Sequence, residues 1–531
     1  MVDVVDANLF SEEEQITSKS ESCIAPMMEL ALDCTKGTPE ARITMKDVVK
    51  RLNKIKNVNE RLDPNNSIVL HRILIGDFVA CFQLTDPGAI LSRITWPPAQ
   101  FPCLWPIYPF SSVLNLENNN FHGGIPYELG HLPCLRVIDI QNNQLQGSIP
   151  SSLFQHPRVQ VISLAFNKLR GEMLKGSWYV PELRVLNLRN NCRTGIIPPS
   201  VGNATKLLNF SLSNNRINGN IPREIGNLSQ LAYLSFVNNQ LTGSIPTSLF
   251  NISSLLSVTL GMNSLYGPLL LDEGNIVSNL KFLSISMNQI FGCIPSNICQ
   301  LTELKVLSIS VNNITGYIPR NIGCLSKLER FYIGDNRIKG TIPASLGNIS
   351  TLKILYCGNN RMRLFSTQSA GRGNSIVLTN ASKLEILSLT KNFLTGAIPT
   401  NLGNLRELRE LLLFDNQLTN EPREHELRFF NSLADCRMLR YLEVGFNPLN
   451  GVLPNSIGNL SSTIETFHIV DAHINGLIPT SIGNMSGLTA LIFQKNNLTG
   501  SIPSDVGKLK PLQGLYLDNN KLQGHIPEAN A

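Results

Sequence analysis

The chain has 531 residues, of which 42% are hydrophobic and 16% are charged, and its formal net charge is +6. This composition is too apolar for a disordered chain, and its basic residues are too scattered to indicate nucleic-acid binding. The eleven cysteines are odd in number and contain no CxxC pair, so they predict neither a zinc site nor a disulfide framework.

The first 57 residues have the pattern of two amphipathic helices. Thr44, with Asp47 three residues later, has the spacing of a capping box. The apolar positions that follow share one helical face: Val48, Leu52 and Ile55. Residues 58–110 show no period, and we expect them to be an irregular linker.

Neither an export signal nor a membrane span is expected in the chain as written. Residues 1–6 place acidic side chains where a secretory signal needs a basic region followed by an apolar core. The best candidate for a span, residues 68–84, contains His71, Arg72 and Asp77, which would be costly at bilayer depth. We therefore reject it as a membrane helix.

From residue 111 to the end, a unit of the form LxxLxLxxNxLxGxIPxxIGNL recurs about 17 times, mostly with a period of 24 residues. In one unit Ala472 replaces the asparagine. Two insertions, at 361–381 and 420–436, lengthen two intervals from 24 residues to 32 and 31. The asparagine stands at 119, 143, 167, 191, 215, 239, 263, 288, 312, 336, 360, 392, 416, 447, 496 and 520.

One unit predicts one short strand. Leu307 and Ile309 are expected to point inward, whereas Ser308 and Ser310 point outward. Because a single strand cannot bury its apolar side alone, the units are expected to stack into one parallel sheet. The asparagine should turn the chain and bond the main chain of its own coil and of the next one.

This unit resembles the leucine-rich repeat, and its GxIPxxIGNL portion looks like the plant-specific subtype found in receptor-like kinase ectodomains. The resemblance covers roughly four-fifths of the chain. It implies an α/β repeat solenoid, a right-handed superhelix with a concave parallel sheet, preceded by the short two-helix segment. It also implies that the concave sheet and the adjacent turns form the binding surface.

Residues 1–57 resemble the C-terminal tail of a plant receptor kinase domain. The strings that carry this resemblance are residues 23–34, 39–42 and 44–55. In that family the residue matching Arg42 pairs with a glutamate far upstream, which is absent here. The glycine-rich loop, VAIK lysine, HRD loop and DFG motif are absent too, so we expect no enzyme activity, no catalytic residue and no cofactor.

The candidate ligand-binding residues are aromatic and charged side chains at outward positions of the concave strands. Such side chains on a rigid sheet lose little entropy when a peptide covers them. For any single residue, the alternative is ordinary variation on a solvated strand face. The candidates are Arg330, Tyr332, Asp335, Tyr356, Lys391, Phe414, Asp415, Tyr441, Glu443 and Phe446.

Two further features leave alternatives open. The insertions 361–381 and 420–436 are as compatible with ligand contact as with plain structural variation. His468, Asp471 and His473 suggest metal ligands, but strand alternation would point them in divergent directions, so no metal site is predicted.

Cysteines and glycosylation sequons indicate in which cellular compartment the repeat array folds. Cys293 with Cys299, or Cys299 with Cys324, could meet across coils, and Cys357 takes an inward position as a buried thiol. The candidate glycosylation sites fit an ectodomain that passes through the secretory pathway. They are Asn203, Asn209, Asn227, Asn251, Asn313, Asn348, Asn380, Asn459, Asn484 and Asn497.

These observations indicate a non-enzymatic recognition solenoid derived from a plant receptor-like serine/threonine kinase. The insertions and residues 431–437 (Asn-Ser-Leu-Ala-Asp-Cys-Arg) resemble the type XII subfamily that contains immune receptors. By resemblance, the parent receptor would bind a peptide on the extracellular side of the plasma membrane, recruit a co-receptor kinase and signal in defence. The alternatives are an active receptor kinase, if the true transcript continues, and a kinase-less decoy or nonfunctional chimeric product.

Overall fold

The computed structural model describes residues 112–173, 176–271, 279–363, 378 and 381–527. All of these belong to the second of the chain's two compact units, residues 99–531. The helices predicted within residues 1–57 and the linker predicted at 58–110 lie outside the described residues.

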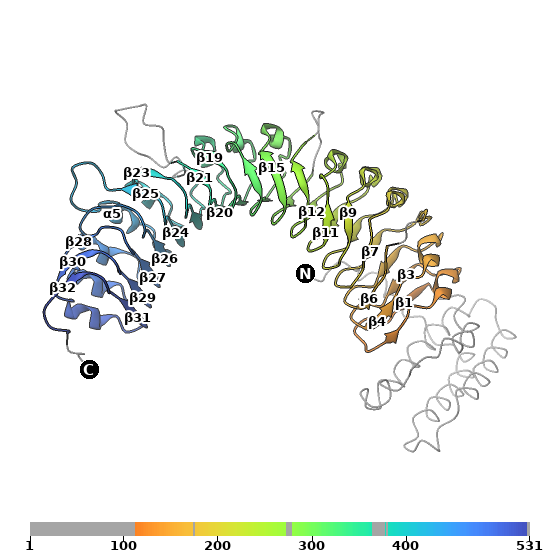
Figure 1. Cartoon of the computed structure of the whole chain (residues 1–531), viewed down its shortest axis with the longest axis horizontal. Helices are drawn as coiled ribbons and strands as arrows, with labels where there is room; N and C mark the ends of the chain where they lie inside the picture. The colour runs from red at the N-terminus through yellow and green to blue at the C-terminus, as the bar shows by residue number, and fades with distance from the viewer. Residues whose placement is uncertain (1–111, 174–175, 272–278, 364–377, 379–380, 528–531) are drawn as a thin grey trace, which may run out of the picture. The chain divides into compact units, whose positions relative to one another are not determined.

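The described residues form a repeat solenoid built on one parallel sheet of 17 strands, in which each strand pairs with the next one along the chain. This confirms the predicted fold class of a repeat solenoid with one parallel sheet. Figure 1 shows these strands on the inner side of the array. They are β1 (Val113–Asn115), β3 (Val137–Asp139), β5 (Val161–Ser163), β7 (Val185–Asn187), β8 (Asn209–Ser211), β10 (Tyr233–Ser235), β12 (Ser257–Thr259), β14 (Phe282–Ser284), β16 (Val306–Ser308), β18 (Arg330–Tyr332), β20 (Ile354–Tyr356), β22 (Ile386–Ser388), β24 (Glu410–Leu412), β26 (Tyr441–Glu443), β27 (Thr466–His468), β29 (Ala490–Ile492) and β31 (Gly514–Tyr516).

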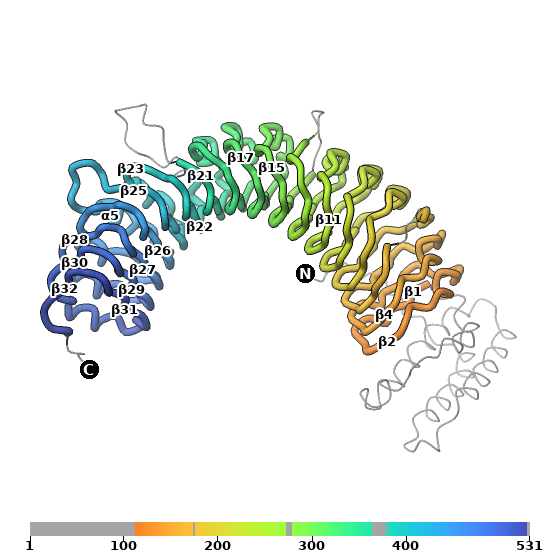
Figure 2. The backbone as a smooth tube through the Cα atoms, viewed as in Figure 1, coloured from red at the N-terminus to blue at the C-terminus, as the bar shows by residue number. Residues whose placement is uncertain are grey.

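A second set of short strands follows the turn of most coils and pairs laterally in groups of two or three. The tube in Figure 2 shows how regularly the coils succeed one another. These strands are β2 (His122–Gly123), β4 (Gln144–Gly147), β6 (Lys168–Leu169), β9 (Asn218–Asn220), β11 (Gln240–Thr242), β13 (Tyr266–Pro268), β15 (Gln289–Cys293), β17 (Asn313–Thr315), β19 (Lys339–Gly340), β21 (Arg361–Met362), β23 (Thr395–Ala397), β25 (Gln417–Thr419), β28 (Asn475–Gly476), β30 (Asn497–Gly500) and β32 (Lys521–Leu522).

The helical part of most coils is a 3₁₀ helix of three or five residues, often entered directly from a proline. Proline fixes φ near the value that such a helix needs at its start. The 3₁₀ helices are η6 (Tyr127–His131), η7 (Ser151–Gln155), η8 (Pro199–Asn203), η9 (Arg223–Asn227), η10 (Thr247–Asn251), η11 (Ser296–Gln300), η12 (Ile322–Cys324), η13 (Ala344–Asn348), η15 (Leu402–Asn404), η16 (Asn455–Asn459), η17 (Thr480–Asn484) and η18 (Ser504–Lys508).

The second insertion is part of the core. It contains α5 (Phe429–Leu433), the α-helix of the described residues, and the Phe430 ring packs edge-on against Phe467 at 5.6 Å between centroids. Phe467 in turn contacts Phe493 at 5.1 Å. These contacts favour a structural role for residues 420–436, whereas most of the first insertion lies outside the described residues.

The recurring asparagine carries the hydrogen-bond network that joins the coils. Asn336 donates from Nδ2 to the carbonyls of Ile333 and Gly334 in its own coil (both 3.1 Å) and of Ile309 in the preceding coil (3.0 Å). Its Oδ1 accepts from the N–H of Ile314, also in the preceding coil, at 3.0 Å. The expectation of bonds to the next coil is therefore wrong in direction, because the amide points back toward the carbonyls left by the earlier turn.

The residue before each of these 16 asparagines, and Asp471 before Ala472, has a left-handed backbone, with φ between 49° and 58°. Asparagine or aspartate occupies ten of these 17 described positions, which matches the tolerance of those residues for this conformation. Val311 (φ 56°) and Met287 (φ 58°) are costlier occupants. The array therefore holds local strain at a few exposed positions of its inner edge.

Candidate ligand-binding face

The predicted site residues lie on or directly after the inner strands, with exposed or half-buried side chains. Arg330, Tyr356, Lys391, Asp415 and Phe446 are exposed. The others, Tyr332, Asp335, Phe414, Tyr441 and Glu443, are half-buried. The strand alternation that predicted them as outward-facing agrees with the structure, because the residues between them are buried.

The structure divides these residues into two groups. In the first, Tyr332 and Tyr356 stand in register on the paired strands β18 and β20. Asp335, at the left-handed position, accepts a hydrogen bond from Asn359 Nδ2 at 2.7 Å. The next strand along, β22, carries Ser388 and is followed by Lys391, which separates this group from the second.

The second group is an aromatic and acidic cluster on β24, β26 and β27. The Phe414 ring contacts the Phe446 ring edge-on at 4.9 Å and stacks on the His468 ring at 5.4 Å. Glu443 lies in register with Leu412 on one side and His468 on the other. Three rings and a carboxylate are thus held side by side on one rigid surface.

Partial burial makes charge on this cluster less favourable than it would be in water. Burial raises the pKa of Glu443, and the neighbouring Glu410 carboxylate raises it further by repulsion. Burial lowers the pKa of His468, whose Nδ1 has no hydrogen-bond partner within the described residues. A ligand cation beside Glu443 would compensate for the burial of its carboxylate. A ligand donor to His468 Nδ1 would supply the hydrogen bond that this nitrogen lacks.

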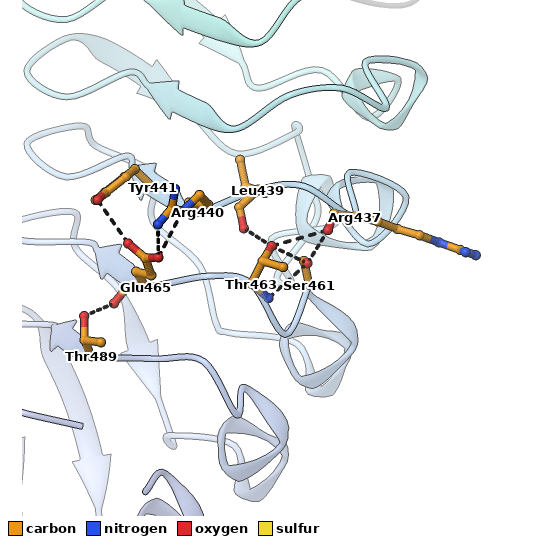
Figure 3. Close-up of polar contacts among 8 residues, drawn as sticks. All are labelled: Arg437, Leu439, Arg440, Tyr441, Ser461, Thr463, Glu465 and Thr489. Carbon is orange, nitrogen blue, oxygen red and sulfur yellow. Dashed lines mark hydrogen bonds and ion pairs between the residues drawn. The ribbon is translucent and has the colours of Figure 1, made fainter. Parts of the chain in front are cut away.

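Tyr441 is fixed by a polar network that joins two coils (Figure 3). Its hydroxyl donates to Glu465 Oε2 at 3.0 Å, and Arg440 Nε donates to Glu465 Oε1 at 2.9 Å. The bond from Tyr441 lowers the pKa of Glu465 after the larger effect of Arg440, and the same bond raises the pKa of Tyr441. Thr489 Oγ1 donates to the main-chain oxygen of Glu465 at 2.8 Å.

The loop on the other side of this network is also anchored. Ser461 Oγ donates to the Arg437 carbonyl at 2.7 Å, and Thr463 Oγ1 donates to the Leu439 carbonyl at 2.8 Å (Figure 3). The coil that carries Tyr441 is thus tied to the coil that carries Glu465 at several points. A tyrosine held this way needs little reordering when a ligand binds.

Sequence reasoning missed Glu410, Arg440 and Glu465, and it considered His468 only as a metal ligand. Arg440 and Glu465 occupy the same repeat position in neighbouring coils, as do Arg409 and Glu385, which pair at 3.6 Å. A search for opposite charges at equal repeat positions could have found both pairs. No group of three potential ligands that could hold a metal occurs among the described residues.

The cysteines and sequons have defined places in the described array. Cys299 and Cys324 form a disulfide between adjacent coils, with Cα atoms 5.5 Å apart, so one of the two open pairings is realised and Cys293 is a free, exposed thiol. Cys357 is buried as predicted, and burial raises the pKa of its thiol. Most sequon asparagines are exposed: Asn203, Asn227, Asn251, Asn313, Asn348, Asn459 and Asn484. Asn209 and Asn497 are half-buried, and Asn380 lies outside the described residues.

Comparison with protein families identifies the repeat. The Leucine Rich Repeat family matches residues 112–132, 134–156, 182–204, 206–228, 279–301, 303–325, 327–349, 383–405 and 438–460. Two Arabidopsis thaliana proteins are each 42% identical to parts of the chain. The probable LRR receptor-like serine/threonine-protein kinase At3g47570 matches over 71 residues, and the LRR receptor-like serine/threonine-protein kinase EFR over 65 residues. These matches cover 13% and 12% of this chain and 7% and 6% of the two relatives. The chain therefore spans only a small part of the length of each relative that it matches.

Solved structures extend the similarity over most of the array. The plant peptide hormone receptor RGFR1, in complex with RGF2, is 29% identical with a TM-score of 0.73, and the match covers 78% of this chain and 64% of that one. The Arabidopsis receptor kinase HAESA, in complex with the peptide hormone IDA and the co-receptor SERK1, is 25% identical with a TM-score of 0.50. That match covers 78% of this chain and 79% of that one. In the part of the chain that the structure describes, we find no helix with the length and apolar character needed to cross a bilayer.

Proposed function

We propose that the inner face between Arg330 and Phe446 recognises a peptide ligand. The chain carries leucine-rich repeats and is similar to plant LRR receptor-like kinases, which supports this proposal. The observation that carries this proposal is the cluster of Phe414, Phe446 and His468 around the half-buried carboxylate of Glu443. Aromatic rings and an incompletely compensated acid on a rigid sheet are what a peptide with apolar and basic side chains would bind.

The geometry of the inner face suits an extended ligand. The tyrosine pair Tyr332 and Tyr356 and the cluster around Glu443 both lie on the one continuous sheet, with a single strand, β22, between the two groups of strands. With neighbouring strands about 4.8 Å apart, the two groups lie within the reach of one short extended peptide. We therefore assign one ligand to both groups. Each group alone offers only a small contact surface, and one peptide would contact both.

The solved relatives support this assignment and extend it to a partner. RGFR1 is a plant peptide hormone receptor in complex with RGF2, and HAESA is in complex with the peptide hormone IDA and the co-receptor SERK1. By analogy, the parent receptor of this array would recruit a co-receptor kinase near the C-terminal end of the array and signal across the plasma membrane from its extracellular side. A role in defence rests on the resemblance of residues 431–437 to type XII receptors. The array itself would act in recognition, without catalysing a reaction.

Binding of selected peptides tests this proposal. Peptides are selected from a random display library on the full chain, and their affinity is measured for the triple variant Tyr332→Ala, Tyr356→Ala and Phe446→Ala. We expect affinity to fall at least about tenfold, which corresponds to a loss of about 1.4 kcal/mol of binding free energy. Removal of each of the three aromatic side chains would contribute a part of this loss. Tyr233→Ala is the matched control, because Tyr233 is exposed on β10 of the same sheet and outside the proposed site. Equal affinity for the parent and the triple variant would show that the ligand binds elsewhere.

A further inference from the structure

The lateral sheet β13–β15–β17 presents exposed aromatic side chains away from the inner face. Tyr266 on β13 is 53% exposed, Phe291 on β15 is 48% exposed, and Tyr317, just after β17, is 60% exposed. These three residues are defined here as the lateral aromatic patch. Large aromatic side chains gathered on a surface usually mark something that covers them.

A glycosylation sequon lies within this patch. Asn313, with Thr315 two residues later, begins β17, and its partner in register on β15 is Phe291. Both residues are exposed, while Ile290 and Ile314 between the exposed positions are buried, so the Asn313 and Phe291 side chains leave the sheet on the same side. Neighbouring parallel strands lie about 4.8 Å apart, which places the ring beside the asparagine amide.

The same two coils contain an independent sign of the secretory route. Cys299 follows β15 and Cys324 follows β17, and the two cysteines form a disulfide. Disulfides persist in oxidising compartments, which include the compartment in which asparagine is glycosylated. The disulfide and the sequon therefore both indicate that this part of the array folds in the secretory pathway.

We propose that Asn313 carries an N-linked glycan whose first sugars cover the lateral aromatic patch. In the attachment step, Asn313 Nδ2 forms a bond to C1 of the first sugar of a lipid-diphosphate-linked oligosaccharide. The C1–O bond to the diphosphate breaks, the lipid diphosphate leaves with the electron pair, and the amide loses one of its two protons. The apolar C–H face of that sugar can then shield Phe291 from water.

The chain contains a matched sequon without the aromatic neighbour. Asn497 begins β30 at the same repeat position as Asn313, and its partner in register on β28 is Asn475. The register partner of Asn497 is therefore polar, whereas that of Asn313 is the Phe291 ring. The pair Asn313 and Asn497 thus separates the effect of a glycan from the effect of its contact with the patch, and neither residue belongs to the proposed peptide site.

The experiment compares glycan occupancy and patch exposure in the secreted protein. The full chain is expressed behind an added secretion leader in plant cells, and occupancy is measured by glycopeptide mass spectrometry. We expect Asn313 to be occupied in most molecules. Thr315→Ser preserves the sequon and should preserve occupancy.

Removal of the glycan should then expose the patch. We expect Asn313→Gln to raise binding of a fluorescent apolar dye, 1-anilinonaphthalene-8-sulfonate, at least twofold, whereas Asn497→Gln leaves it unchanged. Adding Phe291→Ser and Tyr317→Ser to Asn313→Gln should restore the parent value. If Asn313→Gln fails to fold, enzymatic deglycosylation of the folded parent makes the same comparison. An unoccupied Asn313, or dye binding that does not respond to its glycan, would overturn the proposal.

Discussion

Tyr441 and Glu465 come from neighbouring coils, and the tyrosine hydroxyl donates to the glutamate at 3.0 Å. Glu465 also accepts from Arg440, the residue just before Tyr441. The carboxylate therefore fixes the side chain of Tyr441, a proposed ligand-binding residue. This arrangement separates the residue that would contact a ligand from the residue that positions it.

Glu465→Gln should release Tyr441 from this constraint. The hydrogen bond to the charged carboxylate is the largest cause of the raised Tyr441 pKa, so the variant should lower that pKa toward the ordinary value. The measurement is a titration followed by NMR of tyrosine-labelled protein, with the resonance assigned by its loss in Tyr441→Phe. Glu385→Gln is the matched control, because Glu385 pairs with Arg409 at the same repeat position. A Tyr441 titration identical in parent and Glu465→Gln would contradict this account.

The periodic features of the fold were predictable, and the contacts between coils were only partly so. The inward leucines, the strand phase and the turns recur in every unit, so a single pattern specified them 17 times. The partner of Tyr441 is 24 residues away in sequence, and Glu465 alone looks like any solvated residue. Because an asparagine in a stack has a coil on either side, the sequence also did not show that its amide bonds the preceding coil. The role of residues 420–436 depended on Phe430, whose packing against Phe467 no local pattern revealed.

Asn336→Ala should destabilise the array locally. The variant removes four hydrogen bonds to main-chain groups. It leaves the buried Ile314 N–H without its partner, whereas the three carbonyls each keep one other donor. We expect a loss of about 2–4 kcal/mol, measured as faster amide hydrogen exchange in the coils that contain Ile309 and Ile333. Asn321→Ala, on the exposed side of a neighbouring coil, should cost less than about 0.5 kcal/mol. Similar exchange in the two variants would show that the asparagine network contributes little.

Val311→Asn should stabilise the same region. Val311 holds φ at 56° with a branched side chain that is 43% exposed, whereas asparagine occupies this position in many other coils. Relief of the left-handed strain should add about 1 kcal/mol to the local stability, seen as slower hydrogen exchange around β16. Val311→Ala removes the branch at Cβ but has no polar side chain to bond the local backbone, so it should gain less. A lower stability for Val311→Asn would mean that the exposed valine contributes packing that outweighs its strain.

His468 should make the stability of the array depend on pH in a defined direction. Burial lowers its pKa in the folded state below the ordinary value of 6.5, so the unfolded chain binds the proton more tightly. The contribution is therefore fully present above pH 6.5 and decreases as the pH falls from there through the lowered pKa. His468→Gln cannot be protonated, so its unfolding midpoint in denaturant should change less than that of the parent between pH 8 and pH 5. The midpoints at pH 8 serve as the internal reference, because there the two proteins differ only in packing and hydrogen bonding. If the parent and His468→Gln lost stability equally over this range, the partial burial of the imidazole beside Phe414 would have no energetic consequence.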